Sequence, residues 1–491
     1  MSLHVEPSPP KAAPAPASAA VSASVQELST LFEAQRAAQR RDGAPPYEER
    51  IDALERLERD IVRHREDIAR AISADFGNRS RHETLAAEVF VTLSELRHVK
   101  KHLRSWMAPE SRPVSYVFFP GRNEVRYQPL GVVGIISPWN YPLQLALAPL
   151  VGALAAGNRV MIKPSEYVPR TSDLLRTMLA GAFSNEQVAV VGGGPEVGEA
   201  FSRLPFDHLV YTGSTQVGRL VMRAASENLT PLTLELGGKS PTLVLDDAPI
   251  ARAAERIMAG KLYNAGQTCV APDYVLVPEG KEDAFVEAAR RAVAKLYPTL
   301  AANPDYSSLI NDRHADRVRG YVEDARRRGA AVLELNPAGE AFEKSSRKLP
   351  PTLLRGVRDD MAVMRDEIFG PVLPVVGYRR LEDAIDYVNA RPRPLALYCF
   401  SDDRAAVRRV LDETTSGGAA VNETMLHVAQ ADLPFGGVGP SGMGHYHGRD
   451  GFLTFSKSKG VFYQGPVDTG ALLRPPYGKV VEKLLGLLIG R

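Results

Sequence analysis

The chain has 491 residues, of which 44% are hydrophobic and 24% are charged. Its 60 Lys and Arg against 58 Asp and Glu give a net charge of +2, without the basic excess that nucleic-acid-binding proteins carry. A chain of this length exceeds one hydrophobic core, which predicts two or three domains. Its two cysteines, Cys269 and Cys399, are too few for a disulfide framework, so we expect a reducing, cytoplasmic location.

The two ends of the chain differ from the rest in composition. Residues 1–25 are rich in Ala, Pro and Ser and lack the basic start and apolar run of a signal peptide. We interpret them as a disordered lead-in. No stretch reaches the roughly 18 to 20 apolar residues that a membrane span needs. The tail 466–491 holds a shorter apolar segment, 480–489, which predicts a packing helix or a surface tether.

The first third of the chain changes from helical to extended patterning. In residues 26–107, apolar side chains such as Leu54, Leu57 and Ile61 recur at helical spacing between charges. The segment 114–127 contains Pro-Gly-Arg-Asn between apolar runs, which predicts two strands around a turn.

Short apolar runs then alternate with amphipathic segments. The predicted strands are 132–136, 160–162, 188–191 and 208–211, and the predicted helices are 143–156, 171–179, 196–203 and 216–225. Such alternation indicates right-handed βαβ units and a parallel sheet. A second series of the same kind runs from about Thr242 to Ala420. The sequence therefore predicts an α/β protein.

Two glycine-rich segments are candidates for phosphate binding. Gly213–Gly218 follows a predicted strand and opens a helix, where backbone N–H groups and the helix dipole favour an anion. The alternative is an ordinary turn with Ser214 as the helix N-cap. Gly437, Gly439 and Gly442 form a literal G-x-G-x-x-G, but neither a strand before it nor a helix after it is predicted. We therefore assign no nucleotide to that second segment.

The two cysteines have different surroundings. Cys399 lies in the apolar run 395–400, which is typical of a small buried hydrophobic residue. Cys269 ends the polar stretch Asn-Ala-Gly-Gln-Thr-Cys after an amphipathic helix. A thiolate there could attack a carbonyl and form a thioester that is easily displaced, although most free cysteines are structural.

Polar side chains also follow the predicted strands. Glu235 is either a solvated strand-end residue or a partly buried general base. Asn140 lies between two prolines and is either a turn residue or a donor to a developing oxyanion. Lys163 and Glu166 are either a solvated pair or ligands of a dinucleotide ribose. The H-x-H pair at residues 445 and 447 lacks partner ligands, so we expect no metal.

The order of these motifs resembles the aldehyde dehydrogenase superfamily over about residues 26–465. Seven blocks carry the resemblance: 138–142, 163–166, 213–218, 235–238, 266–269, Glu-Ile-Phe-Gly-Pro at 367–371 and Pro-Phe-Gly-Gly at 434–437. Within the superfamily, the segments 264–273 and 441–448 are most similar to the class 3 and fatty-aldehyde branch, and most of all to bacterial coniferyl aldehyde dehydrogenases.

The resemblance implies a role for each matched residue. Cys269 would be the nucleophile, Glu235 the general base, and Asn140 with the Cys269 N–H the oxyanion hole. The implied cofactor contacts are Lys163 and Glu166 at the adenosine ribose, Gly213, Ser214 and Gly218 near the pyrophosphate, and Glu367 and Phe369 at the nicotinamide ribose and ring. The expected cofactor is NAD, with NADP possible, and the substrate is an aromatic aldehyde such as coniferyl aldehyde or a medium or long aliphatic one.

The resemblance also implies the organisation of the chain. The Rossmann-like cofactor domain would comprise 26–107 and 129–240, and the α/β catalytic domain 241–433. A small β bridging element, 108–128 with 434–465, would give a homodimer or a higher oligomer. Two other readings of the chain stay open, a cofactor-independent thiol esterase and a catalytically silent family member that binds NAD.

Overall fold

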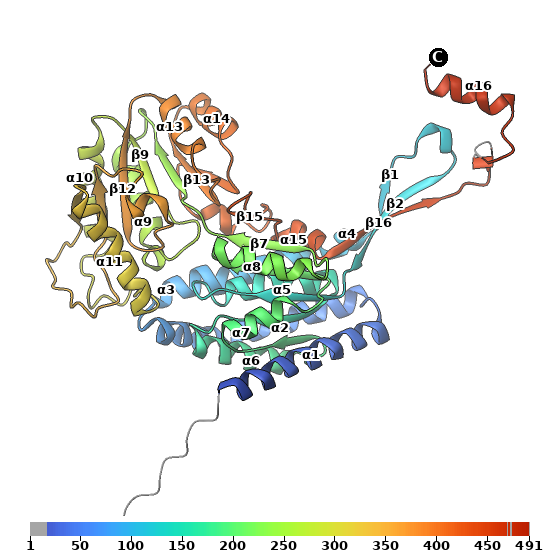
Figure 1. Ribbon diagram of the computed structural model, residues 1–491, viewed down its shortest axis with the longest axis horizontal. Helices are drawn as coiled ribbons and strands as arrows, with labels where there is room; N and C mark the ends of the chain where they lie inside the picture. The colour runs from blue at the N-terminus through green and yellow to red at the C-terminus, as the bar shows by residue number, and fades with distance from the viewer. Residues whose placement is uncertain (1–16, 469, 472–473, 491) are drawn as a thin grey trace, which may run out of the picture.

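The computed structural model describes residues 17–468, 470–471 and 474–490. They form two α/β lobes, packed against each other, and a β arm that projects to one side (Figure 1). One lobe is built on a six-stranded sheet, the other on a seven-stranded sheet, and the arm on a three-stranded sheet. The predicted α/β class with a Rossmann-like sheet and a small β element is confirmed.

The first lobe contains the six-stranded sheet, in the order β15-β7-β6-β3-β4-β5. The parallel strands are β3 (Val132–Ile136), β4 (Arg159–Lys163), β5 (Val188–Val190), β6 (His208–Gly213) and β7 (Leu232–Leu236). Parallel sheets are covered on both faces, which is why these strands read as continuous apolar runs. The four predicted strands are confirmed to within two residues. The short β15 (Gly442–Met443), from the predicted bridging range, pairs antiparallel with β7.

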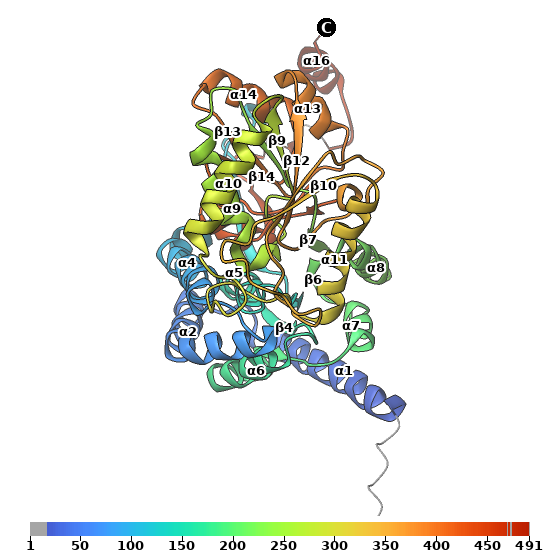
Figure 2. The ribbon, with the colours of Figure 1, turned by 90° about the vertical axis from the view of Figure 1, so that its left-hand side faces the viewer.

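Helices cover both faces of this sheet (Figures 1 and 2). They are α1 (Ala17–Asp42), α2 (Tyr47–Phe76), α3 (Arg81–Thr84), a π-helical turn (Leu85–Phe90), α4 (Val91–Met107), α5 (Gln144–Ala156), α6 (Pro169–Ala182), α7 (Pro195–Ser202) and α8 (Thr215–Ser226). The predicted helices agree to within three residues. Every residue of α5 is buried, as expected for a helix that is apolar on all sides.

The second lobe contains the seven-stranded sheet, in the order β10-β11-β12-β9-β8-β13-β14. Its strands are β8 (Pro241–Val244), β9 (Tyr274–Pro278), β10 (Ala331–Glu334), β11 (Thr352–Arg355), β12 (Val372–Tyr378), β13 (Ala396–Phe400) and β14 (Gly418–Val421). Its helices are α9 (Ile250–Leu262), α10 (Glu282–Leu296), α11 (Asp312–Arg327), α12 (Ala362–Arg365), α13 (Leu381–Asn389) and α14 (Arg404–Glu413). Only β10 is antiparallel to its neighbour in this sheet of the described chain. The second predicted α/β series is confirmed.

One continuous cluster of buried apolar side chains joins the two lobes. It includes Leu54 and Leu147 of the first lobe and Ile257 and Val275 of the second. Because this core crosses from one lobe to the other, their relative position is fixed by packing as well as by the connecting chain.

The arm consists of β1 (Glu110–Arg112), β2 (Arg122–Pro129) and β16 (Ser456–Tyr463), all antiparallel. The prediction of two strands within 114–127 was wrong for the first strand, because β1 ends at Arg112 and Tyr116–Phe118 forms a 3₁₀ turn. Pro113 follows β1 and has no N–H to donate to the strand ladder. Its carbonyl instead accepts a hydrogen bond from the Asn123 side chain at 2.9 Å.

The ends of the chain correct a second prediction. Residues 17–25 belong to α1, because their high alanine content favours a helix, while residues 1–16 lie outside the described part of the chain. In the tail, α16 (Lys479–Leu488) forms a short, mostly exposed helix beside the arm (Figure 1). No helix of the described residues is long and apolar enough to cross a bilayer.

Candidate active site

The carboxyl ends of the parallel strands bring four predicted residues to one edge of the six-stranded sheet. Asn140 lies beyond β3, Lys163 ends β4, Gly213 ends β6 and Glu235 is the penultimate residue of β7. This edge is where open α/β sheets bind ligands.

The loop before Cys269 has an unusual backbone. Asn264, Ala265 and Gly266 follow α9 with φ angles of 50°, 52° and 78°, three successive left-handed residues. This conformation is costly for residues with a Cβ, and a Cβ on Gly266 would clash with the carbonyl of Gly370. The Gln267 side chain holds the loop, since its Nε2 donates to the carbonyls of Asn264 and Ser308, each at 3.0 Å. The strained turn places Cys269 outside regular structure.

Cys269 is half-buried and lines a cavity of about 380 Å³. Most of the lining is apolar and includes Phe90, Val91, Tyr141, Leu145, Met425 and Leu426. A cavity of this size and character can hold an apolar small molecule against the sulfur. Among the aromatic residues near Cys269, Tyr141 lines this cavity. Trp139 and Phe369 do not line it and instead pack on each other, with ring centroids 5.4 Å apart.

Two buried carboxylates lie near the thiol. Glu235 is 2% exposed, so its interpretation as a solvated strand-end residue was wrong. Both of its carboxylate oxygens lack a hydrogen-bond partner among the described residues, and burial raises its pKa well above the usual value. Burial also raises the pKa of the Cys269 thiol, and the charges of Glu367 and Glu235 raise it further. The site thus places a thiol and the Glu235 carboxyl, both with raised pKa values, close to each other.

Asn140 is buried between the two lobes. Its Nδ2 donates one hydrogen to the Gln267 carbonyl at 3.2 Å, and the amide carries a second hydrogen. The Asn140 carbonyl accepts from Asn264 Nδ2 at 3.0 Å. These two bonds tie Asn140 to the loop that precedes Cys269.

The predicted cofactor residues of β4, β6 and α8 lie along the same edge. Lys163 Nζ donates to Glu166 Oε2 at 3.2 Å, and Ser214 is indeed the N-cap of α8, accepting from the Val217 N–H at 3.4 Å. A Cβ on Gly218 would lie 2.6 Å from Leu236, so this glycine lets α8 pack closely on β7. The helix start remains open to an anion.

Glu367 approaches this edge from the second lobe. Its carboxylate lies against Gly237, where a Cβ would overlap it. Its Oε1 lacks a partner among the described residues, and burial, followed by the charge of Asp273, raises its pKa to about 8. Phe369, two residues on, has a left-handed φ of 48°. A buried acceptor beside a glycine cradle fits a ligand with hydroxyl donors, such as the ribose of a dinucleotide.

His445 and His447 lie in the C-terminal loop that follows β15. Within the described residues, no group of three or more His, Cys, Asp or Glu side chains could hold a metal ion. His447 is buried and stacks on Phe435 with ring centroids 5.1 Å apart. The segment of Gly437, Gly439 and Gly442 is a loop that leads into β15, so its rejection as a nucleotide fingerprint agrees with the structure.

Comparison with known proteins gives the family. The aldehyde dehydrogenase family matches residues 11–461. A probable coniferyl aldehyde dehydrogenase of Caulobacter vibrioides is 53% identical over 464 residues, which cover 93% of this chain and 96% of that protein. The coniferyl aldehyde dehydrogenase of a Pseudomonas species is 48% identical over 467 residues, 94% of this chain and 96% of that protein. The substrate-bound Staphylococcus aureus AldH superposes with a TM-score of 0.89 at 37% identity, covering 94% and 99% of the chains.

The chain belongs to the aldehyde dehydrogenase family. The predicted resemblance and enzyme class are confirmed, and the activity is the oxidation of an aldehyde with NAD(P)⁺.

The sequence alone did not point to three buried charged residues of this aldehyde dehydrogenase, Arg79, Glu83 and Glu88. They lie behind the loop of residues 137–143 between β3 and α5, which we call the Asn140 loop. Glu83 accepts from the Asn264 N–H at 3.0 Å, and burial raises its pKa to about 7. The available signal was a single charge, Glu88, within the apolar run 85–90.

Proposed function

We propose that this aldehyde dehydrogenase carries its acyl intermediate on Cys269. The observation that supports this most is the position of a half-buried sulfur at the wall of an apolar cavity, where burial and then the charges of nearby Glu367 and Glu235 raise the pKa of the Cys269 thiol. In this proposal, an aldehyde enters the cavity and its carbonyl carbon meets the sulfur. Addition of the sulfur gives a thiohemiacetal, and oxidation converts that into a thioester.

Asn140 and the backbone N–H of Cys269 would bind the oxygen of the thiohemiacetal. Removing one such donor typically costs about 3–4 kcal/mol in transition-state stabilisation. Glu235 would then take a proton from the water that cleaves the thioester and releases the acid. Burial raises the Glu235 pKa well above its usual value, which makes its carboxylate a stronger base than a solvated one.

The cofactor would be held along the edge of the six-stranded sheet. Lys163 and Glu166 would bind the adenosine ribose, Gly213, Ser214 and Gly218 would flank the pyrophosphate, and Glu367 and Phe369 would contact the nicotinamide ribose and ring. When bound, the cofactor supplies the hydride acceptor. We propose NAD in preference to NADP, because the Glu166 carboxylate would repel a 2′-phosphate.

The substrate is proposed to be an aromatic aldehyde of the coniferyl type. Two relatives carry that name, and the apolar lining of the 380 Å³ cavity suits a phenylpropanoid ring. Medium and long aliphatic aldehydes are the alternative. Values of kcat/KM for coniferaldehyde, benzaldehyde and hexanal to decanal, with each cofactor, distinguish these classes. An enzyme that prefers decanal over coniferaldehyde would overturn the aromatic assignment.

Replacing Glu235 with Gln tests whether this residue is needed for hydrolysis of the thioester but not for its formation on Cys269. We expect a burst of about one NADH per site on mixing Glu235→Gln with aldehyde and NAD, followed by turnover reduced by about 10²-fold or more. The matched control is Glu95→Gln, since Glu95 is also buried with a pKa raised to about 7 but accepts from the Gly448 N–H and is not among the residues that line the cavity. Steady turnover of Glu235→Gln at the wild-type rate would contradict the assignment.

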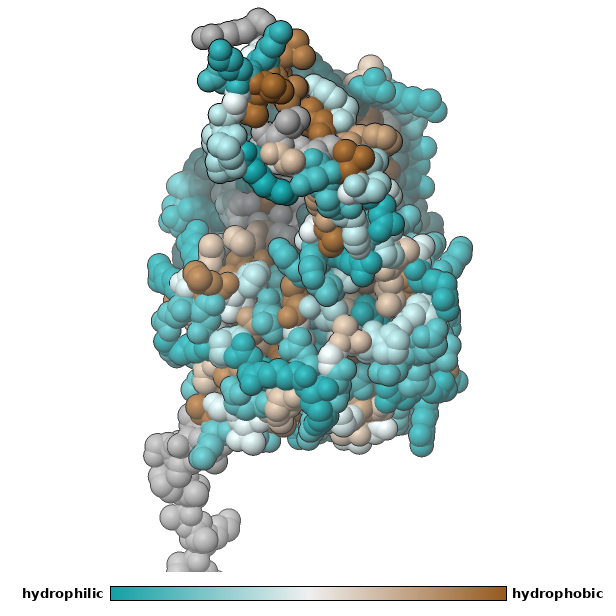
Figure 3. Space-filling model, turned by 90° about the vertical axis from the view of Figure 1, so that its right-hand side faces the viewer, coloured by the Kyte–Doolittle hydropathy of each residue, from teal (hydrophilic) through white to brown (hydrophobic). Residues whose placement is uncertain are grey.

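We further propose that the chain acts as a cytoplasmic homodimer, with 26–107 and 129–240 as its cofactor domain, 241–433 as its catalytic domain and the arm as the bridging element. Support for the cytoplasm comes from the two free cysteines. The dimer is supported by apolar side chains on the arm, where Tyr116 is 80% and Phe119 70% exposed, and Figure 3 shows apolar residues at this end.

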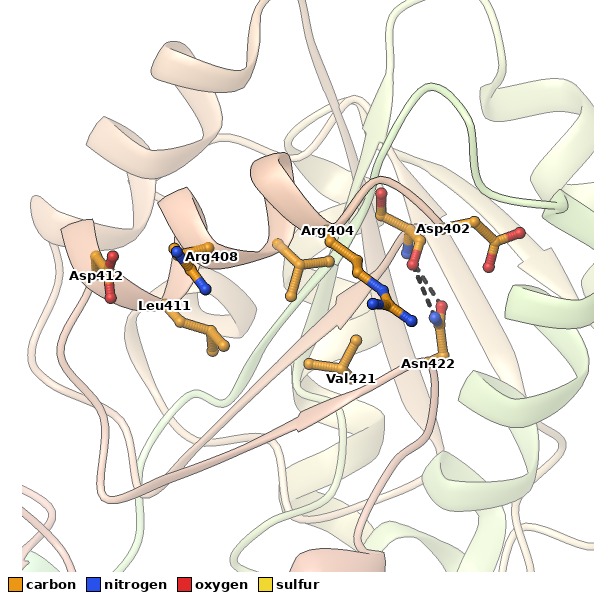
Figure 4. Close-up of a pocket in the computed structure, with 9 residues that line it drawn as sticks. Asp402, Arg404, Arg408, Leu411, Asp412, Val421 and Asn422 are labelled. Carbon is orange, nitrogen blue, oxygen red and sulfur yellow. Dashed lines mark hydrogen bonds between the residues drawn. The ribbon is translucent and has the colours of Figure 1, made fainter.

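The surface that we propose for binding the partner's arm is the edge of β14, which has no further strand beyond it among the described residues. There, a groove of about 590 Å³ runs between β14 and α14, with Leu411 and Val421 on its walls (Figure 4). The double variant Tyr116→Glu/Phe119→Glu should shift the mass measured by light scattering from dimer to monomer, since buried charges oppose association. A wild-type chain that is monomeric at micromolar concentration would overturn the proposal.

A further inference from the structure

A fully buried ion pair lies behind the loop that carries Asn140. Arg79 Nη1 donates to Glu88 Oε1 at 2.7 Å, and both side chains are 0% exposed. Arg79 follows α2, and Glu88 lies in the π-helical turn 85–90. π-Helical turns are rare and are frequent at functional sites.

The pair contacts the Asn140 loop at both of its ends. The same Arg79 Nη1 donates to the Asn140 carbonyl at 2.8 Å. Glu88 Oε2 accepts from the backbone N–H groups of Leu143 at 2.7 Å and Gln144 at 3.1 Å. These bonds to charged groups hold the backbone on either side of the two intervening residues.

A second contact extends from Arg79 toward the nucleophile. Its guanidinium lies 4.6 Å from the centre of the Tyr141 ring, and the Tyr141 hydroxyl is 2.7 Å from Thr268 Oγ1. Thr268 directly precedes Cys269. Arg79 therefore contacts two residues near the site. One is Asn140, which would bind the oxyanion, and the other is Tyr141, which is hydrogen-bonded to Thr268.

Stability alone does not explain this pair. Taking two charges out of water costs several kcal/mol, and apolar residues of equal volume are often as stable. Moreover, Nε and Nη2 of Arg79 have no hydrogen-bond partner among the described residues. The pair is costly to bury, its hydrogen-bonding groups are not all satisfied, and it contacts the Asn140 loop. These features together indicate a functional constraint.

We propose that Arg79 and Glu88 are positioning residues that fix the Asn140 side chain for the oxyanion. Arg79 holds the backbone carbonyl of Asn140. In this position, the side-chain amide keeps one hydrogen on the Gln267 carbonyl and directs the other at the substrate oxygen. The inference rests on the proposed role of Asn140, and neither Arg79 nor Glu88 touches the substrate.

A double-mutant cycle tests the coupling to Asn140. Arg79→Met should lower kcat/KM for the aldehyde by about 10²-fold, since a small misplacement of a catalytic group has that effect. In the Asn140→Ala background, the same change should lower kcat/KM by less than about threefold, because the group that it positions is gone. Alkylation of Cys269 by iodoacetamide forms no oxyanion, so its rate and the Kd for NAD should stay within about twofold.

Two further variants keep the test decisive. Glu88→Gln keeps the size of the side chain but weakens the bond to Arg79, and it should show the same pattern with a smaller loss. Arg50→Met removes another buried arginine, which donates to the Pro45 and Ala155 carbonyls away from the cavity, and it should lower Tm without changing kcat/KM.

The inference is overturned if the loss of kcat/KM in these variants does not depend on the presence of Asn140. If Arg79→Met and Glu88→Gln reduce kcat/KM equally in both backgrounds, or slow alkylation as much as turnover, the pair does not act through Asn140. If Asn140→Ala itself keeps the wild-type kcat/KM, the proposed oxyanion hole fails, and the inference fails with it.

Discussion

The two cysteines lie in the same lobe and show how strongly local structure governs a thiol. Cys399 belongs to β13, is fully buried, and pairs in register with Leu243 on one side and Val421 on the other. Cys269 follows three left-handed residues, is half-buried and lines the apolar cavity. Cys399 is thus part of the hydrophobic core, whereas Cys269 lies at the wall of a cavity that a ligand can enter.

Burial raises the pKa of both thiols, so acidity does not separate them. The difference lies in access to the apolar cavity and in the nearby carboxylates of Glu235 and Glu367, to which the proposed mechanism adds Asn140 as a donor to the oxyanion. A strained loop makes this possible, because regular strand geometry would satisfy the backbone and close the sulfur into the sheet.

The largest expected contrast comes from removing each sulfur in turn. Cys269→Ala should lower the rate of NADH formation by about 10³-fold or more, since no nucleophile remains. Cys399→Ala should leave kcat/KM within about twofold and lower only the free energy of unfolding, by about 1 kcal/mol. Steady-state kinetics and urea unfolding measure the two effects. Comparable activity losses in both variants would remove the distinction.

A smaller contrast concerns the backbone around each sulfur. Gly266→Ala places a Cβ against the Gly370 carbonyl at a φ of 78°, so we expect the loop to shift and kcat/KM to fall by about 10²-fold. Leu397→Ala in β13 should instead reduce stability by about 2–5 kcal/mol, with near-normal kcat/KM of the folded enzyme. A Gly266→Ala enzyme of full activity would show that the turn is not needed.

The smallest expected effect concerns pH. Because burial and the charges of Glu367 and Glu235 raise the pKa of the Cys269 thiol, its alkylation by iodoacetamide should accelerate steadily from pH 7 to pH 10. Glu235→Gln removes one negative charge, which lowers the thiol pKa and should speed alkylation severalfold at pH 9. Cys399 should stay unlabelled throughout. A rate that falls in Glu235→Gln would reverse the sign of this coupling.

Much of the fold was predictable because its signals are local. Apolar strands of the two sheets, the all-apolar α5 and the order of the motifs around Asn140, Glu235 and Cys269 can be read within a few residues. By contrast, the first strand of the arm was misplaced, since the effect of Pro113 on strand pairing was not recognised.

The rest depends on contacts between residues far apart in the chain. The burial of Glu235 depends in part on β15, whose Gly442 pairs with it in register and which is not visible in its sequence neighbours. Likewise, Arg79 meets Asn140 across 61 positions, so no local pattern could place it behind the proposed oxyanion hole.

The most direct test is the mass of the acyl-enzyme. Glu235→Gln, mixed with coniferaldehyde and NAD and then acid-quenched, should gain one acyl group per chain. Peptide mapping should place it on Cys269, and hydroxylamine should remove it, as expected for a thioester. Absence of the adduct despite NADH release, or its location on Cys399, would contradict the proposal that Cys269 carries the acyl group.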